Sequence, residues 1–277
     1  MPAFSKAAQA ISNAKGILIA TGAGMGVDSG LPDFRGNEGF WKAYPPFQKR
    51  GLSFYDLANP RWFTEDPTQA WGFYGHRFNL YAATKPNAGF AILKRWGDTK
   101  PCGSFVYTSN VDCHFQASGF DNNRIVECHG SFQNLQCSAP CGERTWSAED
   151  LKLEVDESSM LAIEPLPKCD SCEAVARPNI LMFGDGQWIG THTATQEDRF
   201  NSWIMEVPRS DLVVIEIGAG TAVPTVRRQT ESLMQRRFAK LIRINPRESQ
   251  GPEGTISIPC GGLEALQKID ELLSADS

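Results

Sequence analysis

The sequence predicts an α/β protein, and three observations support this fold class. Short apolar runs, each long enough for one buried strand, recur at residues 16–20, 104–107, 124–127, 179–182, 212–217 and 241–244. Stretches with helical spacing separate several of these runs, which is typical of a largely parallel sheet with covering helices. Two segments interrupt this alternation of strand and helix patterns and indicate insertions, namely residues 40–80 and 132–175. We therefore expect a Rossmann-like core with a smaller inserted domain.

The first two elements of the chain follow directly from side-chain spacing. Phe4, Ala7 and Ile11 recur at helical intervals, so the first 15 residues are expected to form a short amphipathic helix. The next run, Gly16–Ala20, predicts a buried strand. The later apolar runs, with the helical stretches between them, are expected to complete the sheet.

These patterns also predict how the chain divides. The large domain is expected to combine residues 1–39, 81–131 and 176–277. The two insertions would form the small domain. Residues 40–80 are dense in aromatic residues and proline and are expected to be helical, whereas residues 132–175 contain two close pairs of cysteines.

Composition excludes several classes of protein. The chain has 277 residues, of which 41% are hydrophobic, and this is ample for a packed core. Its formal net charge of -5 argues against nucleic-acid binding, which depends on an excess of Lys and Arg. We interpret Arg227-Arg228 and Arg236-Arg237 as solvated helix faces. No apolar run approaches the roughly 20 residues that span a bilayer, and no secretory signal is visible, so we expect a soluble cytoplasmic protein without membrane contact. The oligomeric state stays open.

Four of the eight cysteines form the pairs Cys137-x3-Cys141 and Cys169-x2-Cys172. Two short turns that each supply two thiolates suit a closed, tetrahedral Zn2+ site. A closed site leaves no position for a water ligand, so the zinc should stabilise the small domain and take no part in catalysis. The alternative is four reduced thiols without a metal. The other cysteines are expected to be small buried residues: Cys102, Cys113, Cys128 and Cys260.

A glycine-rich segment follows the first predicted strand: Thr21-Gly-Ala-Gly-Met-Gly-Val-Asp-Ser-Gly-Leu-Pro-Asp-Phe-Arg35-Gly36. Glycines at a strand-to-helix turn allow backbone N–H groups to approach a pyrophosphate closely. Gly22, Gly24 and Gly26 occur at every second position, which is not the usual G-x-G-x-x-G spacing. Taken alone, the segment fits an ordinary tight turn about as well as a nucleotide site.

The segment as a whole resembles the cofactor loop of sirtuins, G-A-G-x-S-x-x-S-G-I-P-D-F-R. Other sirtuin motifs have counterparts in the same order along the chain. Thr108-Ser-Asn-Val-Asp112 is similar to T-Q-N-I-D, His129-Gly130 to the catalytic H-G, and Arg177-Pro-Asn-Ile-Leu-Met-Phe-Gly-Asp185 to R-P-x-V-x-x-F-G-E. Ile217-Gly218 and Ile244-Asn245 stand where sirtuins have later NAD-contacting loops. The resemblance extends from about residue 10 to residue 270.

The resemblance implies that NAD is a cosubstrate and that an acyl-lysine protein or peptide is the substrate. In sirtuins the acyl oxygen attacks C1′ of the nicotinamide ribose, nicotinamide leaves, and the products are free lysine and acyl-ADP-ribose. His129 would be the catalytic base, a task that suits a side chain with a pKa near neutral pH. Asn110 and Asp112 would orient the ribose, an ordered water and the carboxamide.

The same resemblance implies the binding residues. Phe34 would shield C1′ from water, and Arg35 would bring positive charge to the ribose-phosphate side. The full set of implied cofactor-binding residues is Gly22, Ala23, Gly24, Asp33, Phe34, Arg35, Ser109, Asn110, Asp112, Gly218, Ala219, Thr221 and Asn245. The implied substrate-binding residues are Met182, Phe183 and Gly184.

Several positions depart from the sirtuin pattern, mostly on the cofactor side. Gly26 stands where sirtuins commonly have Ser, Ser109 replaces Gln, and Ala219-Gly220 replaces T-S. Asn110, Asp112 and His129 are all present, so we expect a working NAD-dependent protein-lysine deacylase of a divergent branch. Two alternatives remain. The altered ribose side favours an ADP-ribosyltransferase or NAD hydrolase, and a non-catalytic NAD-sensing protein is the third reading.

Overall fold

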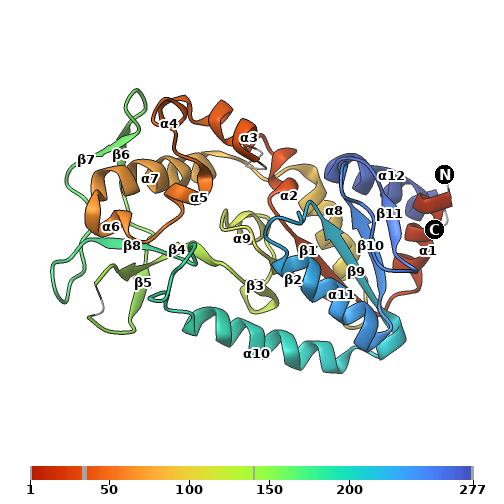
Figure 1. Ribbon diagram of the computed structural model, residues 1–277. Helices are drawn as coiled ribbons and strands as arrows, with labels where there is room; N and C mark the ends of the chain where they lie inside the picture. The colour runs from red at the N-terminus through yellow and green to blue at the C-terminus, as the bar shows by residue number, and fades with distance from the viewer. Residues whose placement is uncertain (1, 33–35, 140, 276–277) are drawn as a thin grey trace.

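The computed structural model describes residues 2–32, 36–139 and 141–275. Six strands form a parallel sheet: β1 (Gly16–Thr21), β2 (Ser104–Thr108), β3 (Ile125–Glu127), β9 (Leu212–Ile217), β10 (Lys240–Ile244) and β11 (Ile256–Ile258). Their order in space is β11-β10-β9-β1-β2-β3, so the two halves of the sheet meet where β1 lies beside β9 (Figure 1). This doubly wound topology confirms the predicted fold class. Such sheets bind ligands outside the carboxyl ends of the strands at this meeting point.

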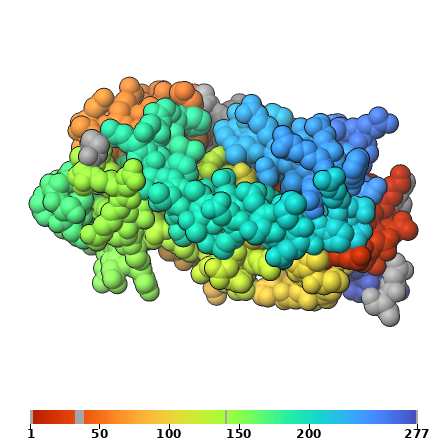
Figure 2. All heavy atoms as spheres, turned by 90° about the horizontal axis from the view of Figure 1, so that it is seen from below, coloured from red at the N-terminus to blue at the C-terminus, as the bar shows by residue number. Residues whose placement is uncertain are grey.

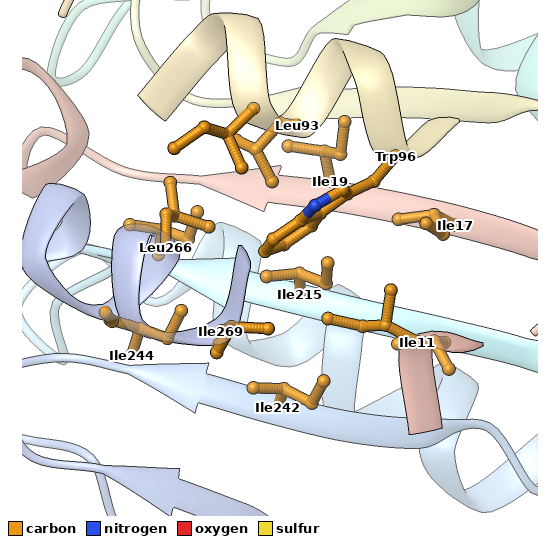
Figure 3. Close-up of a cluster of buried hydrophobic side chains, with 14 of the residues drawn as sticks. Ile11, Ile17, Ile19, Leu93, Trp96, Ile215, Ile242, Ile244, Leu266 and Ile269 are labelled. Carbon is orange, nitrogen blue, oxygen red and sulfur yellow. The ribbon is translucent and has the colours of Figure 1, made fainter. Parts of the chain in front are cut away.

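Alternate side chains of the sheet face two layers of helices. Ile17 and Ile19 of β1 belong to the core under α1 (Pro2–Asn13), α8 (Ala88–Asp98) and α12 (Gly262–Ala275), where Trp96 packs among isoleucines (Figure 3). Leu18 and Ala20 face the opposite layer, formed by α10 (Thr191–Glu206) and α11 (Thr225–Arg237). Both faces are buried, which explains why these strands occur in the sequence as continuous apolar runs.

The two insertions fold together beside this sheet. The first forms α3 (Gly36–Ala43), α4 (Pro45–Lys49), α5 (Phe54–Leu57), α6 (Trp62–Glu65) and α7 (Pro67–Ala83). The second forms an antiparallel sheet of order β5-β4-β8 and a hairpin, with β4 (Gly130–Cys137), β5 (Thr145–Ser147), β6 (Glu154–Asp156), β7 (Leu161–Ile163) and β8 (Ala176–Ile180). A shared core rich in aromatic rings joins the helices to the strands, and it includes Phe40, Phe63, Trp71, Phe73, Tyr74 and Phe132.

The structure corrects one of the strand predictions. The apolar run at 179–182 does not enter the parallel sheet, because its strand, β8, ends at Ile180 and pairs antiparallel with β4. A run of apolar residues shows that a strand is buried, but it does not show in which sheet. Strand β11 has no counterpart among the predicted runs, since its three residues, Ile256–Ile258, include a polar serine.

Helix α10 lies along one face of the molecule and contacts β3 and the short 3-10 helix η1 (Asn122–Arg124). Figure 2 shows its surface along the middle of the face seen from below. A second 3-10 helix, η2 (Arg209–Asp211), leads from α10 into β9. None of the helices in the described ranges has both the length and the apolar character needed to cross a bilayer.

Two loops interlock at the carboxyl ends of β1 and β9. Gly22 N donates a hydrogen bond to Ile217 O at 3.0 Å, and Gly24 N donates one to Gly218 O at 3.1 Å. A Cβ atom on Gly22 would lie 2.7 Å from Ala219 Cα, and one on Gly218 would lie 2.5 Å from Gly24 Cα. Gly218 also has a φ of +64°, which disfavours other residues. These glycines are therefore needed for backbone packing at the mouth of the crevice.

The interlock predicts unequal effects for two glycine substitutions. Gly103 has a similar φ of +67° but no neighbour within 4 Å of its Cβ position, so Gly103→Ala should cost only about 1 kcal/mol. Gly218→Ala adds a clash with the backbone of Gly24 and should cost about 3 kcal/mol or more. Urea unfolding without NAD measures both free energies of unfolding. Equal losses in the two variants would contradict the interlock.

Candidate active site and metal centre

Buried polar side chains hold the loop after β9 from the protein interior. The carbonyl oxygen of Ala219 accepts hydrogen bonds from Arg227 Nε at 3.2 Å, Arg227 Nη2 at 3.1 Å and Asn245 Nδ2 at 2.9 Å. Asn245 is fully buried, and its Oδ1 accepts hydrogen bonds at 3.0 Å from the backbone N–H groups of Arg247 and Glu248. Asn245, which the sequence assigned to cofactor binding, therefore shapes this loop from inside the protein.

Arg227 is a residue whose position the sequence prediction missed. The interpretation of Arg227-Arg228 as a solvated face is correct only for Arg228, because Arg227 is buried. The same holds for the second pair, in which Arg236 is exposed and Arg237 is buried. The signal was present in the helical spacing. Both buried arginines share a face of α11 with Thr230 and Leu233, which are also buried.

Thr221 stands at the exposed end of the same loop. Its backbone N and its Oγ1 donate hydrogen bonds to the two carboxylate oxygens of Glu248, at 3.1 Å and 2.7 Å. The hydroxyl is therefore already engaged within the chain. A ribose that reaches Thr221 would meet the Glu248 carboxylate beside it.

The loop after β2 carries Ser109 and Asn110, which are both half-buried. Its first residues are tied to β1. Thr21 Oγ1 donates to Thr108 Oγ1 at 2.7 Å, and the same Thr108 oxygen accepts from Asn110 N at 3.0 Å. Ser109 N donates to Thr21 O at 3.0 Å. The end of β1 and the backbone of Asn110 are thus parts of one hydrogen-bonded unit.

Asp112 lies in surroundings that disfavour its charge. Burial raises the pKa of its carboxyl group, whereas the charges of His114 and Arg77 act to lower it. The backbone N–H of His114 donates to Asp112 Oδ1 at 3.0 Å. Arg77 is buried in the aromatic core, and its Nη2 donates to the hydroxyl of Tyr81 at 2.9 Å. Positive charge therefore lies behind the loop that carries Asp112.

His129 stands where the two sheets meet. It follows β3, and Gly130 opens β4 with a φ of +74°. A Cβ atom on Gly130 would lie 2.1 Å from Asn179 O, so glycine is required there. The carbonyl oxygen of His129 accepts from Leu181 N at 2.9 Å, and its Nε2 lies 3.1 Å from Thr225 Oγ1. Burial lowers the pKa of the imidazole below its ordinary value of 6.5.

The pairing of strands brings two of the expected catalytic residues, Asn110 and His129, to one edge. Thr108 of β2 lies opposite Glu127 of β3, and Cys128 N donates to Thr108 O at 2.9 Å. Asn110 and His129 consequently follow neighbouring strands at their carboxyl ends. This is the edge at which open α/β sheets present groups to ligands.

The predicted substrate segment is a turn fixed by a buried ion pair. Arg177 donates to both carboxylate oxygens of Asp185, at 2.7 Å and 2.9 Å, and neither side chain is accessible to more than 1%. Met182 is buried in the aromatic core, so its side chain packs inside the protein. The Phe183 ring lies 4.3 Å from that of Tyr55, and Gly184 is exposed. The roles of Met182, Phe183 and Gly184 toward substrate stay predictions.

The other cofactor-binding predictions divide into two groups. Gly22, Ala23 and Gly24 line the start of α2 (Gly24–Val27) at the switch point of the sheet. Asp33, Phe34 and Arg35 lie outside the described residues, and their assigned roles stay predictions.

The four paired cysteines come together in space. Their Sγ atoms all lie within 4.8 Å of one another, with 3.5 Å between Cys137 and Cys172 and 3.6 Å between Cys141 and Cys169. Sulfur atoms around a tetrahedral zinc, each bound at about 2.3 Å, are about 3.8 Å apart. The cluster therefore fits Zn2+, and its position in the small unit, away from His129, fits a structural ion.

A doubly wound parallel sheet with a glycine-rich loop at its switch point, joined to a four-thiolate cluster, is typical of dinucleotide-binding proteins with a structural metal. The chain belongs to the Sir2 family, whose model matches residues 22–224. The catalytic edge and both insertions lie within that matched range.

Relatives and solved structures agree with this assignment. The chain is 31% identical over 248 residues to the NAD-dependent protein deacylase 1 of Archaeoglobus fulgidus, covering 88% of this chain and 86% of the relative. It is 29% identical over 284 residues to the NAD-dependent protein deacylase of Aeropyrum pernix, covering 100% of each. A solved complex of a Sir2 homologue with NAD is similar with a TM-score of 0.73 and 26% identity, covering 98% of this chain and 94% of that chain.

The cysteine cluster predicts one zinc ion per chain. Cys169→Ser should remove the ion and lower the melting temperature by several degrees, because binding energy at a structural zinc site is folding energy. Cys260→Ser, which is outside the cluster, should retain the ion. Elemental analysis and thermal unfolding of both variants test this. Full zinc content in Cys169→Ser would contradict the four-thiolate site.

The burial of His129 predicts where activity is lost at acidic pH. A base must be neutral, and because its folded pKa is below 6.5, the neutral form persists to lower pH than it would in the unfolded chain. The midpoint of the acidic limb of kcat/KM should therefore lie below pH 6.5. The stability contributed by the buried neutral imidazole is present above that pH and is lost as the pH falls. Circular dichroism at each pH controls for unfolding, and a midpoint above 6.5 would count against His129 as this base.

Proposed function

We propose that this protein is an NAD-dependent protein-lysine deacylase that transfers the acyl group to ADP-ribose and releases nicotinamide. The observation that carries the proposal is the placement of Asn110, Asp112 and His129 at one edge of the sheet, beside the glycine crevice. Their arrangement would supply an amide, a carboxylate and a base to a single ribose. Membership of the Sir2 family and relatives named NAD-dependent protein deacylases support it.

The crevice would hold NAD through the backbone of its two interlocked loops. NAD supplies the ribose carbon that accepts the acyl oxygen when nicotinamide departs. The glycines of the loop after β1 would allow the pyrophosphate to approach the backbone closely, and the loop after β9 is kept rigid by Arg227 and Asn245. A crevice that is already formed loses little conformational entropy on binding.

His129 would accept the proton of a ribose hydroxyl. Burial keeps its imidazole neutral, and the contact between its Nε2 and Thr225 Oγ1 orients the ring. Asn110 is fixed by its backbone bond to Thr108, which leaves the amide side chain to orient ribose or carboxamide. General-base catalysis of this kind contributes roughly 100-fold to 10,000-fold in rate.

The acyl-lysine of a protein or peptide is the proposed second substrate. The segment after β8 leads away from His129 O, which binds Leu181 N, and ends in the exposed Gly184. An acyl-lysine that lies along this segment would present its acyl group close to the catalytic edge. The buried ion pair of Arg177 and Asp185 keeps the segment in place.

Transfer of ADP-ribose, or hydrolysis of NAD, is a second candidate favoured by one observation. The Thr221 hydroxyl is bound to Glu248, so the loop after β9 offers fewer free groups to the ribose than its sequence suggests. A loosely held ribose would be more open to water or another nucleophile. This reading predicts that nicotinamide is released without an acyl substrate.

Product analysis by mass spectrometry after incubation with NAD and an acetylated peptide tests the proposal. Wild type should form nicotinamide and deacylated peptide in equal amounts, with acyl-ADP-ribose as third product. His129→Ala should reduce the rate at least about 100-fold, whereas Arg236→Ala, an exposed substitution on α11, should not. Nicotinamide release that is independent of peptide would support the second candidate. NAD binding without turnover, across several acyl chains, would indicate a non-catalytic protein.

A further inference from the structure

A buried carboxylate lies two residues before His129. Glu127 is the last residue of β3, is 2% exposed, and receives its hydrogen bonds from neutral amide and hydroxyl groups. A buried carboxylate is costly unless hydrogen bonds compensate for its lost hydration. A buried glutamate at position 127 is therefore not explained by its contribution to folding stability.

Two glutamines hold the two carboxylate oxygens of Glu127. Gln116 Nε2 donates to Oε1 at 3.0 Å, and Gln196 Nε2 donates to Oε2 at 3.3 Å. The Gln196 amide cannot be turned round without loss, since its Oε1 accepts the backbone N–H of Glu127 at 2.9 Å. With Gln196 held in this way, the group at position 127 must accept from it, whereas the Gln116 side chain has no other hydrogen-bonding partner among the described residues and can turn round. A carboxylate accepts from both glutamines as they stand, whereas an amide at 127 would require Gln116 to turn round.

These bonds connect Glu127 to the loop that carries Asp112. Gln116 belongs to α9 (His114–Ala117), and the first N–H of that helix donates to Asp112 Oδ1. Gln196 belongs to α10, which also donates from Thr193 Oγ1 to the carbonyl oxygen of Glu127 at 3.0 Å. Glu127 thus ties the catalytic loop to a long helix that covers the sheet.

The loop that Glu127 holds is strained. Cys113, directly after Asp112, has a φ of 61°, a left-handed conformation that non-glycine residues adopt only when their surroundings hold them there. Its Sγ lies 3.3 Å from Ser131 Oγ, and Ser131 is in turn one of the hydrogen-bonding partners of Glu127. A strained loop relaxes when its supports are removed.

We propose that Glu127 is a positioning residue, whose carboxylate holds the Asp112 loop and the His129 strand end in register for the reaction. It acts through Gln116, Gln196 and Ser131 and does not itself touch substrate. The kinetic part of this inference rests on the proposed deacylase function. The structural part concerns the order of the loop and does not depend on turnover.

A double-mutant cycle tests the carboxylate. Glu127→Gln keeps the shape, and its amide N–H faces Gln116, which must turn round to accept it. Gln196→Glu alone places two carboxylates in contact. Together the two substitutions exchange the groups, because the new carboxylate at 196 can accept from the new amide at 127 and from the backbone N–H. Glu206→Gln, an exposed change on the same helix, is the matched control.

Gln196→Glu should lower kcat about tenfold or more, since a small misplacement of catalytic groups is costly, with KM for acyl-peptide changed less than about twofold. Glu127→Gln should lower kcat less, because Gln116 can turn round to accept the new amide N–H. The double variant should recover to within about threefold of wild type, and Glu206→Gln should match wild type. Hydrogen exchange of the backbone amides of residues 112–118 should rise in Gln196→Glu and return to the wild-type rate in the double variant.

The exchange measurement separates this inference from the proposed function. If wild type does not deacylate but exchange follows the cycle, the deacylase proposal fails and the positioning role stands. Unchanged exchange and kcat in Gln196→Glu would overturn the positioning role. It would equally be overturned by a double variant no better than Gln196→Glu, since Glu127 would then act by charge or by bulk packing.

Discussion

The close approach of two backbone loops at the centre of the parallel sheet is the constraint on which the site depends. Gly22 and Gly218 have no room for a Cβ atom, because each faces the backbone of the other loop. The two hydrogen bonds between the loops close this contact. The crevice is consequently a rigid product of the sheet, and Arg227 and Asn245 reinforce it from behind.

A second close approach joins the two units at His129, the proposed catalytic base. Gly130 lies against the backbone of Asn179, so β3 of the large sheet continues directly into β4 of the small one. His129 is the residue at the turn, and its carbonyl oxygen binds the segment after β8. The base is thus positioned by the junction itself, between the cofactor crevice and the segment proposed to receive substrate.

Buried charge is concentrated around these two contacts. Arg177 and Asp185 fix the segment after β8, and Glu216 and Arg243 pair across β9 and β10 with Nε to Oε1 at 2.7 Å. Such pairs add little net stability over apolar residues of the same shape, but removing one partner is costly. Loss of one member of either pair should therefore destabilise the fold more than loss of a surface charge. Glu127 differs, since its hydrogen-bonding partners are neutral and burial raises the pKa of its carboxyl group.

The sequence by itself determined the fold class, the motif-bearing loops and the four metal ligands. Strands buried on both faces appear as uninterrupted apolar runs, and zinc ligands repeat at short fixed spacings, so both are local patterns. Only the tertiary structure decided which sheet the 179–182 run joins and that Glu127 is held by Gln116 and Gln196. Each of these depends on partners from other elements, up to 69 positions away for Glu127 and Gln196, and no local pattern encodes such a contact.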